Sequence, residues 1–366
     1  MSFDSLMREA LDLAAHAIGL SDPNPRVGCV LTAPDGRTIG RGHTQQVGGP
    51  HAEVMALRDA EAAGQSVRGA TAIVTLEPCA HHGRTPPCCD ALIAAGIARV
   101  VYAIDDPFAQ VAGQGAARLR SAGIEVQRLP AGELSNASRE LNIGFFSRIE
   151  RGRPWVRLKV AASLDGRSAL DNGISQWITA EPARRDGHAW RRRAGAVLTG
   201  AGTIKDDNPR LDVRMVETAR QPLRVVIDSR LEVAPDSRIF APPGPVLIYA
   251  AAADEQRANA LRASGAEIAW QAGAHGKVDL SAMLVDLARR GINELHVEAG
   301  HRLNGSLVRE GLVDEFLIYL APMLIGNGRG LADFGNLTSL ADAPRLRFTD
   351  VTRIGDDLRL LARPID

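Results

Sequence analysis

Apolar residues recur every three or four positions in the first segment of the chain, a spacing typical of an amphipathic helix. The repeat runs from Leu6 to Ile18 and Gly19 follows it, so we expect a helix over residues 4–19. Two apolar runs, 27–32 and 38–42, then flank the turn sequence Pro34-Asp35-Gly36. Runs of this length around such a turn predict a β-hairpin.

The same alternation of helical and strand patterns continues in both halves of the chain. In the first half we expect a helix at 51–63, strands at 70–76 and 99–104, each followed by a turn and a helical pattern, and a polar helix after Leu129. In the second half we expect strands at 155–161 and near 196–200, 223–228, 245–250, 294–298 and 315–321, and helices near 181–193, 280–290 and 303–310. Such alternation predicts two α/β domains.

A charged segment, 148–154, ends in glycine and proline and separates the two halves. Linkers of this composition mark domain boundaries, so we expect domains at 1–150 and 151–366. A chain of 366 residues is also long enough for two ordinary cores.

Composition limits the classes of function. Hydrophobic residues make up 45% of the chain and charged residues 23%, as in globular proteins. Lys and Arg together number 43, as do Asp and Glu, so no net charge attracts a nucleic acid. No apolar run reaches the ~18 residues that a membrane helix needs, and the N-terminus lacks the pattern of a secretory signal. We expect a cytoplasmic protein, a homo-oligomer, without nucleic-acid or membrane partners.

Three residues in the first half have the chemistry of zinc ligands. His51 precedes a predicted helix, Cys79 follows Pro78 after a predicted strand, and Cys88 begins the next predicted helix. One imidazole and two thiolates leave the fourth tetrahedral position open, as in catalytic zinc sites. Glu53, two residues after the histidine, is then the carboxylate that moves a proton from water to a leaving amine. This set predicts a zinc-dependent deaminase with Glu53 as the catalytic residue.

One alternative ligand and two alternative functions stay open at this stage. Cys89 competes with Cys88 as the third ligand, and Cys89 or His82 could complete a purely structural zinc site in a nucleotide-binding regulator. A nucleic-acid-editing deaminase with a C-terminal binding module is the other alternative. That function would call for stacking aromatic residues, whereas aromatic residues make up only 4% of the chain.

The second half contains two glycine-rich segments after predicted strands, 200–203 and 298–305, but no GxGxxG motif after its first strand. Glycines let a backbone approach a ligand, and a following helix start offers amide donors to a phosphate. We expect a third segment, 326–330, to be a surface loop. In the run Trp190-Arg191-Arg192-Arg193, the neighbours of Arg191 are expected on a solvated helix face.

Together these motifs resemble the bifunctional deaminase/reductase family of riboflavin biosynthesis. The first half carries Pro23-Asn24-Pro25-Arg26-Val27-Gly28, Gly49-Pro50-His51-Ala52-Glu53 and the segment from Thr75 to Cys88; the second half carries Lys159 to Gly166, Ser175 to Thr179 and Val297 to Gly300. The resemblance implies an N-terminal cytidine-deaminase-like α/β/α domain followed by a dihydrofolate-reductase-like α/β domain. It also implies two cofactors, Zn²⁺ in the first domain and NADPH in the second, and a small phosphorylated pyrimidine as substrate.

The resemblance further implies the binding residues. The deaminase substrate would contact Asn24, His43, His81 and Arg84. The reductase substrate would contact Ser175, Arg191, Leu211, Arg214 and Glu298. NADPH would contact Ala161, Trp177, Thr203, Asp207, Ser229, Gly300, His301, Arg302, Leu303, Asn304, Gly305 and Ser306. Hydride transfer needs a nearby acid or cation, and the sequence does not choose among the catalytic candidates Lys159, Asp207 and Glu298.

Overall fold

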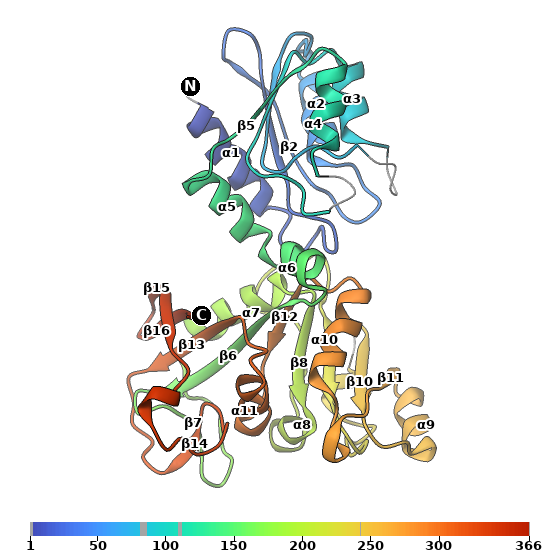
Figure 1. Cartoon of the computed structure of the whole chain (residues 1–366). Helices are drawn as coiled ribbons and strands as arrows, with labels where there is room; N and C mark the ends of the chain where they lie inside the picture. Colours follow the sequence, from blue (N-terminus) through green and yellow to red (C-terminus); the bar gives the residue numbers. More distant parts are fainter. Residues whose placement is uncertain (1–2, 81–85, 109–111, 242, 366) are drawn as a thin grey trace. The chain divides into compact units, whose positions relative to one another are not determined.

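The chain folds into two units, Met1–Gly152 and Arg153–Asp366. The computed structural model describes residues 3–80, 86–108, 112–241 and 243–365 (Figure 1). Both units combine helices with a β-sheet, so the predicted α/β class is confirmed. In these ranges no helix combines the length and apolar character that a bilayer crossing requires.

A five-stranded sheet in the order β2-β1-β3-β4-β5 forms the centre of the first unit. Strands β3, β4 and β5 are parallel, whereas β1 pairs antiparallel with both β2 and β3. The elements are α1 (Phe3–Ala15), β1 (Gly28–Thr32), β2 (Thr38–His43), α2 (Ala52–Ala62), β3 (Thr71–Val74), α3 (Cys88–Ala94), β4 (Arg99–Tyr102), α4 (Gln114–Ser121), β5 (Glu125–Arg128), α5 (Glu133–Leu141) and α6 (Ile143–Arg151).

Alternating strand residues bury their side chains on opposite faces of this sheet. Cys29 and Leu31 of β1 belong to a core that also contains Ala56 of α2 and Leu92 of α3. Val30, between them, belongs to a second core with residues of α1 and α5. Helices therefore cover both faces, and the first unit has three layers, α/β/α.

Helix α2 approaches strand β2 closely because two glycines face it. A Cβ atom on Gly42 would lie only 2.3 Å from the carbonyl oxygen of Ala52, and one on Gly40 would lie 2.3 Å from that of Ala56. A side chain at either position would push the helix outward. The glycines thus hold the start of α2, where His51 and Glu53 lie, close to the sheet.

The second unit is built on a nine-stranded sheet in the order β11-β10-β9-β8-β12-β6-β13-β16-β15, with β7 and β14 paired separately. The strands are β6 (Trp155–Ser163), β7 (Arg167–Leu170), β8 (Ala196–Gly200), β9 (Leu223–Ile227), β10 (Val246–Ala250), β11 (Ala266–Trp270), β12 (Glu294–Val297), β13 (Glu315–Ala321), β14 (Gly328–Gly330), β15 (Leu346–Ile354) and β16 (Asp357–Pro364). The helices are α7 (Glu181–Arg193), α8 (Ala201–Asp207), α9 (Glu255–Ala263), α10 (Leu280–Arg289) and α11 (His301–Arg309), with 3₁₀ turns at Arg238–Phe240, Ala274–Gly276 and Leu340–Asp342.

The strands from β11 to β13 in this order pair in parallel, whereas β16 pairs antiparallel with both β13 and β15. Parallel strands covered on both faces are apolar along their whole length. Strand β10 is an example, because Val246 to Ala250 are all buried. Ligands bind at the carboxyl ends of such strands, so the fold places a binding site at that edge of the sheet.

Several predicted boundaries need correction. The first helix ends at Ala15 instead of residue 19, and helix α11 begins at His301 instead of residue 303. The polar helix after Leu129 is divided into α5 and α6 at Asn142, whose side chain bonds the backbone N–H and C=O of Arg26. The predicted surface loop at 326–330 contains β14, which pairs antiparallel with β7.

Candidate active sites

Three predicted zinc ligands lie together in the first unit. His51 is the residue before α2, Cys88 is the first residue of α3, and Cys79 lies beyond the end of β3. The Nδ1 atom of His51 lies 2.9 Å from Cys88 Sγ and 3.7 Å from Cys79 Sγ, and the two sulfur atoms are 3.3 Å apart. All three atoms are within 4.8 Å of one another. We call this set the His51–Cys79–Cys88 cluster.

The dimensions of this cluster fit a zinc ion. Zn–S bonds of about 2.3 Å and Zn–N bonds of about 2.0 Å in a tetrahedron separate the ligand atoms by roughly 3.5–3.8 Å. The observed separations, 2.9–3.7 Å, are slightly shorter, and small outward shifts would complete three corners. Softness of the two sulfur donors also matches zinc.

Glu53 lies in the first turn of α2 and is only 3% exposed. Its carboxyl group interacts with the Cys88 thiol and with the charges of Cys79 and His51, so it belongs to the same site. Burial raises the pKa of this carboxyl above its ordinary range. The first turn of a helix is where residues two apart can both face a group in front of the helix end.

The two cysteines of the cluster differ in protonation. The pKa of Cys79 is lowered to about 4 because Cys88 donates a hydrogen bond to it, and His51 and the backbone N–H of Cys88 add to this effect. The pKa of Cys88 is raised well above its ordinary value, first by its hydrogen bond with Cys79 and then by burial. Cys79 is therefore the more readily deprotonated sulfur of the two.

Cys89 is outside this cluster. Its Sγ atom lies 3.4 Å from the carbonyl oxygen of Pro78 and 3.6 Å from that of Gly115, and burial raises its pKa to about 12. A thiol held protonated between two carbonyl groups is a poor metal ligand. His82, the other rival, is outside the described residues.

Of the predicted deaminase substrate residues, two can be placed. His43 is the last residue of β2, and its ring meets that of His16 edge-on with centroids 5.6 Å apart. Burial and the charge of His16 lower the pKa of His43. Asn24 lies in the turn before β1, where its backbone N–H donates to Ser21. His81 and Arg84 are outside the described residues.

A cavity of about 570 Å³ opens in the second unit. Its lining includes twelve of the residues predicted for the reductase site: Lys159, Ala161, Ser175, Trp177, Arg191, Thr203, Asp207, Leu211, Arg214, Glu298, Gly300 and His301. They come from β6, α7 and α8, from the segments before α7 and after α8, and from the residues between β12 and the start of α11. The cavity is thus at the carboxyl ends of parallel strands β8 and β12.

A network of charges centred on Glu298 lies at this cavity. Arg191 grips both carboxylate oxygens, with distances of 2.5 and 2.9 Å, and Lys159 Nζ lies 3.8 Å from Oε2. Burial alone would raise the pKa of Glu298, but the charges of Arg191 and Lys159 outweigh it and hold the pKa well below its usual range. Burial lowers the pKa of Lys159. Glu298 is therefore a carboxylate, and Lys159 is the group more ready to release a proton.

The third charged candidate, Asp207, has a different partner. Ser175 donates a hydrogen bond to its carboxylate, with oxygen–oxygen distances of 2.9 and 3.1 Å. Burial raises the pKa of Asp207, and the bond from Ser175 opposes this rise. A predicted substrate residue and a predicted cofactor residue thus touch one another at this point of the cavity.

Comparison with known proteins identifies the family. Residues 154–360 match the family described as "RibD C-terminal domain", and residues 2–104 match "Cytidine and deoxycytidylate deaminase zinc-binding region". The "Riboflavin biosynthesis protein RibD" of Escherichia coli (strain K12) is 44% identical over 373 residues, covering 98% of this chain and 99% of that protein. The chain belongs to the RibD family. The suspected resemblance is confirmed.

Solved structures of the RibD family agree over the whole chain. Acinetobacter baumannii RibD, form 1, has 37% sequence identity and a TM-score of 0.88 and covers 100% of this chain and 99% of that one. A diaminohydroxyphosphoribosylaminopyrimidine deaminase/5-amino-6-(5-phosphoribosylamino)uracil reductase from Thermotoga maritima has 32% identity and a TM-score of 0.87, with 99% of both chains covered. The cytidine-deaminase-like and dihydrofolate-reductase-like folds predicted for the two halves are confirmed. The alternative of a nucleic-acid-editing deaminase is wrong, because the second half is a RibD C-terminal domain.

Six residues predicted to bind NADPH in this RibD-family chain are not in the lining of the cavity: Ser229, Arg302, Leu303, Asn304, Gly305 and Ser306. The last five lie within α11, because the helix begins at His301. The side chain of Asn304 donates a hydrogen bond to the carbonyl of Leu331. A Cβ atom on Gly305 would lie 1.8 Å from the carbonyl oxygen of Asp333. Close packing against 331–333 gives these two positions a structural role, and their contact with a cofactor stays a prediction.

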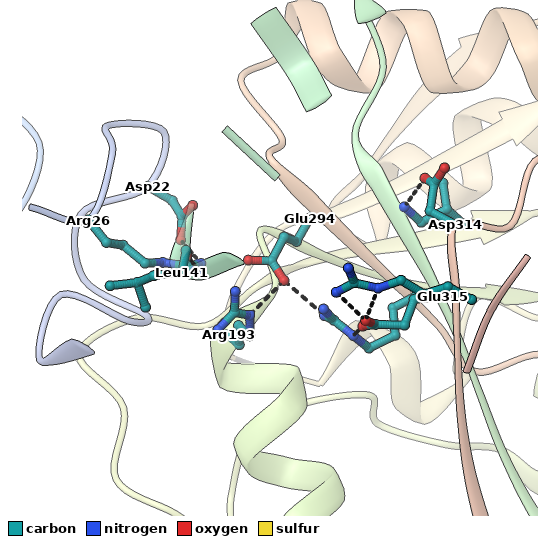
Figure 2. Close-up of polar contacts among 10 residues, drawn as sticks. Asp22, Arg26, Leu141, Arg193, Glu294, Asp314 and Glu315 are labelled. Carbon is teal, nitrogen blue, oxygen red and sulfur yellow. Dashed lines mark hydrogen bonds and ion pairs between the residues drawn. The ribbon is translucent and has the colours of Figure 1, made fainter. Parts of the chain in front are cut away.

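Sequence reasoning missed how deeply the arginine run of α7 is involved in the fold. Arg193 was predicted on a solvated face, but it forms an ion pair with Glu294 at 2.8 Å, as Figure 2 shows. Glu294 also forms an ion pair with Arg157 at 2.8 Å. Glu315 in turn bonds Arg157 and Arg363. Spacing gave a signal for this network, because Arg157 and Lys159 alternate along β6, and Glu294 of β12 and Glu298 directly after it are also an even number of residues apart.

Another residue that sequence reasoning missed is His188, which lines the cavity and is 4% exposed. Its Nδ1 atom accepts a hydrogen bond from the backbone N–H of Arg214 at 3.2 Å. Burial, together with the charges of Arg191 and Arg214, lowers its pKa to about 4. A neutral histidine beside two arginines can accept this bond without adding positive charge.

Proposed function

We propose that this chain catalyses two consecutive steps of riboflavin biosynthesis. Residues 1–150 deaminate 2,5-diamino-6-(5-phosphoribosylamino)pyrimidin-4-one by zinc-dependent hydrolysis, and residues 151–366 reduce the ribosyl group of the product to ribityl with NADPH. One observation carries the proposal: His51, Cys79 and Cys88 bring three ligand atoms within 4.8 Å beside the buried Glu53. The whole-length likeness to proteins named for riboflavin biosynthesis supports it.

In the deaminase half the cluster would hold the metal, and Glu53 would move the proton. Bound zinc supplies an activated water for attack on the ring carbon that carries the amino group. Glu53 accepts a proton at its carboxylate and delivers it to the nitrogen that leaves as ammonia. Its burial keeps bulk water from competing for that proton, since only 3% of the residue is exposed. Asn24, His43, His81 and Arg84 are proposed to orient the pyrimidine and its ribose phosphate.

In the reductase half we propose that Lys159 donates the proton that hydride transfer requires. Reduction of the opened ribosylamine adds a hydride to C1 and requires positive charge or a proton nearby. Glu298 is engaged by Arg191 through both oxygens, and Asp207 accepts from Ser175, so neither is well placed to donate. Lys159 is partly buried, lines the cavity, and has a pKa lowered by desolvation. Lysine ammonium groups lose their proton more readily when buried.

The cavity also has the charge that phosphorylated ligands need. Arg184, Arg191, Arg214 and Arg329 line it together with Lys159, and a planar guanidinium can donate two hydrogen bonds to one phosphate. NADPH and the ribose phosphate both carry such groups. Arg191 and Arg214, with Ser175, Leu211 and Glu298, are proposed to contact the substrate, and the cofactor residues named above are proposed to contact NADPH.

Two assays on the full chain test this function. Incubation with the diaminopyrimidinone ribosyl phosphate should release ammonia without NADPH. When NADPH is then added, one molecule of NADPH should be oxidised for each molecule of deaminated product. Mass spectrometry should find the replacement of one amino group by oxygen, followed by a gain of two hydrogens. Ammonia release that requires NADPH, or NADPH oxidation with no reduced product, would contradict the proposed order.

We also propose that the protein is a homo-oligomer in the cytoplasm. Strand β15 is the edge of the nine-stranded sheet, and it exposes Phe348 and Val351, 64% and 59% accessible, as β16 exposes Leu358. Monomeric proteins rarely leave apolar residues on a sheet edge. All four cysteines are free, which suits a reducing compartment. Light scattering on a sizing column would test the first point, and a mass of 39 kDa would overturn it.

A further inference from the structure

Glu77 is a buried carboxylate that the proposed chemistry does not use. It follows strand β3 and precedes Pro78 and the proposed ligand Cys79, and it is 3% exposed. Its Oε2 atom accepts from the backbone N–H of Gly113 at 3.0 Å and of Asp106 at 3.5 Å, and Oε1 accepts from that of Ala116 at 3.0 Å. All of these partners are backbone donors.

Two of these donors, Gly113 and Ala116, lie at the start of helix α4, and the third, Asp106, lies in the segment after β4. The first amide groups of a helix have no partner within it, and a capping side chain normally accepts from them. Here the capping position is Gly113, which has no side chain. Glu77, 36 residues earlier in the chain, supplies the missing acceptor. Its negative charge is also favourable at a helix N-terminus.

The cap that Glu77 forms on α4 holds in place the segment that carries Cys79. The backbone N–H of Glu77 donates to Ile104, and a Cβ on Gly115 of α4 would lie only 1.9 Å from the carbonyl oxygen of Pro78. On the other side the carbonyl of Cys79 accepts from the backbone N–H of Cys89 in α3 at 3.2 Å. Residues 77–79 are thus held between the starts of α3 and α4, without a contact from Glu77 to any ligand atom of the cluster.

We propose that Glu77 is the positioning residue of the Cys79 ligand, and that its cap on α4 sets how firmly the His51–Cys79–Cys88 cluster retains its metal. The proposal rests on the zinc site proposed above. A cluster held in place before the metal binds loses less conformational freedom on binding, so it releases the metal more slowly. Loss of the cap would let the 77–79 segment move away from α4 and Cys79 away from its two partners.

The first test replaces Glu77 by glutamine in the full chain. Glutamine keeps the size, but its amide nitrogen meets backbone N–H groups and cannot accept from them. We expect zinc release to a chromogenic chelator about tenfold faster than in the parental protein, as loss of one hydrogen-bonded contact implies. We also expect the visible absorption of the Co²⁺-substituted protein to weaken, because cobalt reports a distorted thiolate site. NADPH-dependent reduction should not change.

A second variant and a matched control separate positioning from general stability. Gly115→Ala disturbs the same contact while Glu77 remains, because its methyl group meets Pro78, so zinc should again leave faster and the cobalt spectrum should change. Val101→Ala truncates a fully buried residue in the core on the other face of the sheet. It should lower the thermal midpoint without altering zinc release or the cobalt spectrum.

Each outcome bears on the proposal. Parental zinc release in a folded Glu77→Gln protein would overturn it, as would an equal acceleration in Val101→Ala. If Glu77→Gln does not fold, Gly115→Ala decides: parental zinc release there would overturn the proposal, and faster release would support it. A parental protein that binds no zinc would instead refute the proposed deaminase, which is a distinct failure.

Discussion

The two candidate sites of this chain are built in different ways. The His51–Cys79–Cys88 cluster gathers three ligand atoms within 4.8 Å from two helix starts and the segment after one strand. The reductase cavity encloses about 570 Å³, and residues from many elements line it. The cluster can be read from a short motif because metal chemistry needs few atoms at fixed distances, whereas a cavity needs a surface that only the whole fold creates.

The charges of the two sites also differ. In the cluster, Cys79, whose pKa is lowered to about 4, lies next to Cys88 and the buried Glu53, so negative charge gathers there beside the one imidazole of His51. In the cavity, Glu298 is already balanced by Arg191 and Lys159, and further arginines line the walls. The first site therefore calls for a cation, and the second for phosphate groups. Each of the following variants should affect one site and leave the other unchanged.

The largest effect is expected for Glu53→Gln. Without the proton carrier, ammonia release should fall about a thousandfold, within the range for general acid–base groups. Zinc content should stay at the parental level, because glutamine leaves the three ligands untouched. Glu61→Gln, an exposed position in the last turn of the same helix, is the control and should keep full activity. Parental ammonia release by a zinc-loaded Glu53→Gln protein would show that another group moves the proton.

The next effect in size concerns the cavity. Arg191→Met would leave the partly buried Glu298 without its bidentate partner and would remove the strongest positive charge beside this carboxylate. We expect kcat/KM for NADPH-dependent reduction to fall about a hundredfold, at an unchanged rate of ammonia release. Arg185→Met, on the exposed side of the same helix, removes only the surface pair with Glu181 and should change neither. Equal losses in both variants would mean that helix stability, and not the contact with Glu298, matters.

A smaller effect is expected on the pH dependence of the stability of the second unit. His188 has a pKa of about 4 in the fold, below its ordinary 6.5, so between these values the unfolded chain binds a proton that the folded chain does not. Stability is therefore lost as the pH falls from about 6.5 to about 4, by up to ~3 kcal/mol. Urea unfolding of His188→Gln at several pH values should show a shallower acid loss. A slope equal to the parental one would contradict the assignment.

Ser175→Ala should produce the smallest change. It removes the hydrogen bond to Asp207, and one such bond contributes about 1 kcal/mol, or roughly fivefold in an equilibrium. We expect the KM for the reductase substrate or for NADPH to rise by that factor while kcat stays near the parental value. Steady-state kinetics with each substrate varied in turn would distinguish the two. A loss in kcat alone would place Ser175 in the chemical step instead.

The contrast between the sites also explains what could be predicted from sequence. The hairpin of β1 and β2 and the strands β8, β12 and β13 follow from local patterns of apolar residues and turns. The cluster followed because His51 and Cys88 lie at helix starts that the pattern reveals. These features depend on neighbours in the sequence, so periodicity is sufficient to find them.

Features that depend on distant partners were missed or misread. Nothing local shows that Arg193 bonds Glu294 about a hundred residues away, or that Glu77 caps α4. Asn142 divides a predicted helix because its side chain bonds the backbone of Arg26, 116 residues earlier. Helix α11 begins at His301, two residues before the expected start, and its Asn304 and Gly305 pack against residues 331–333. In each case a tertiary contact outweighs the local pattern.

The most direct test of the account measures zinc and both activities on one preparation of the full chain. We predict one zinc per chain, complete loss of ammonia release after its removal by a chelator, recovery when zinc is returned, and NADPH-dependent reduction that is the same throughout. Ammonia release by the zinc-free protein, or reductase activity that disappears together with the metal, would contradict the division of chemistry between the two sites.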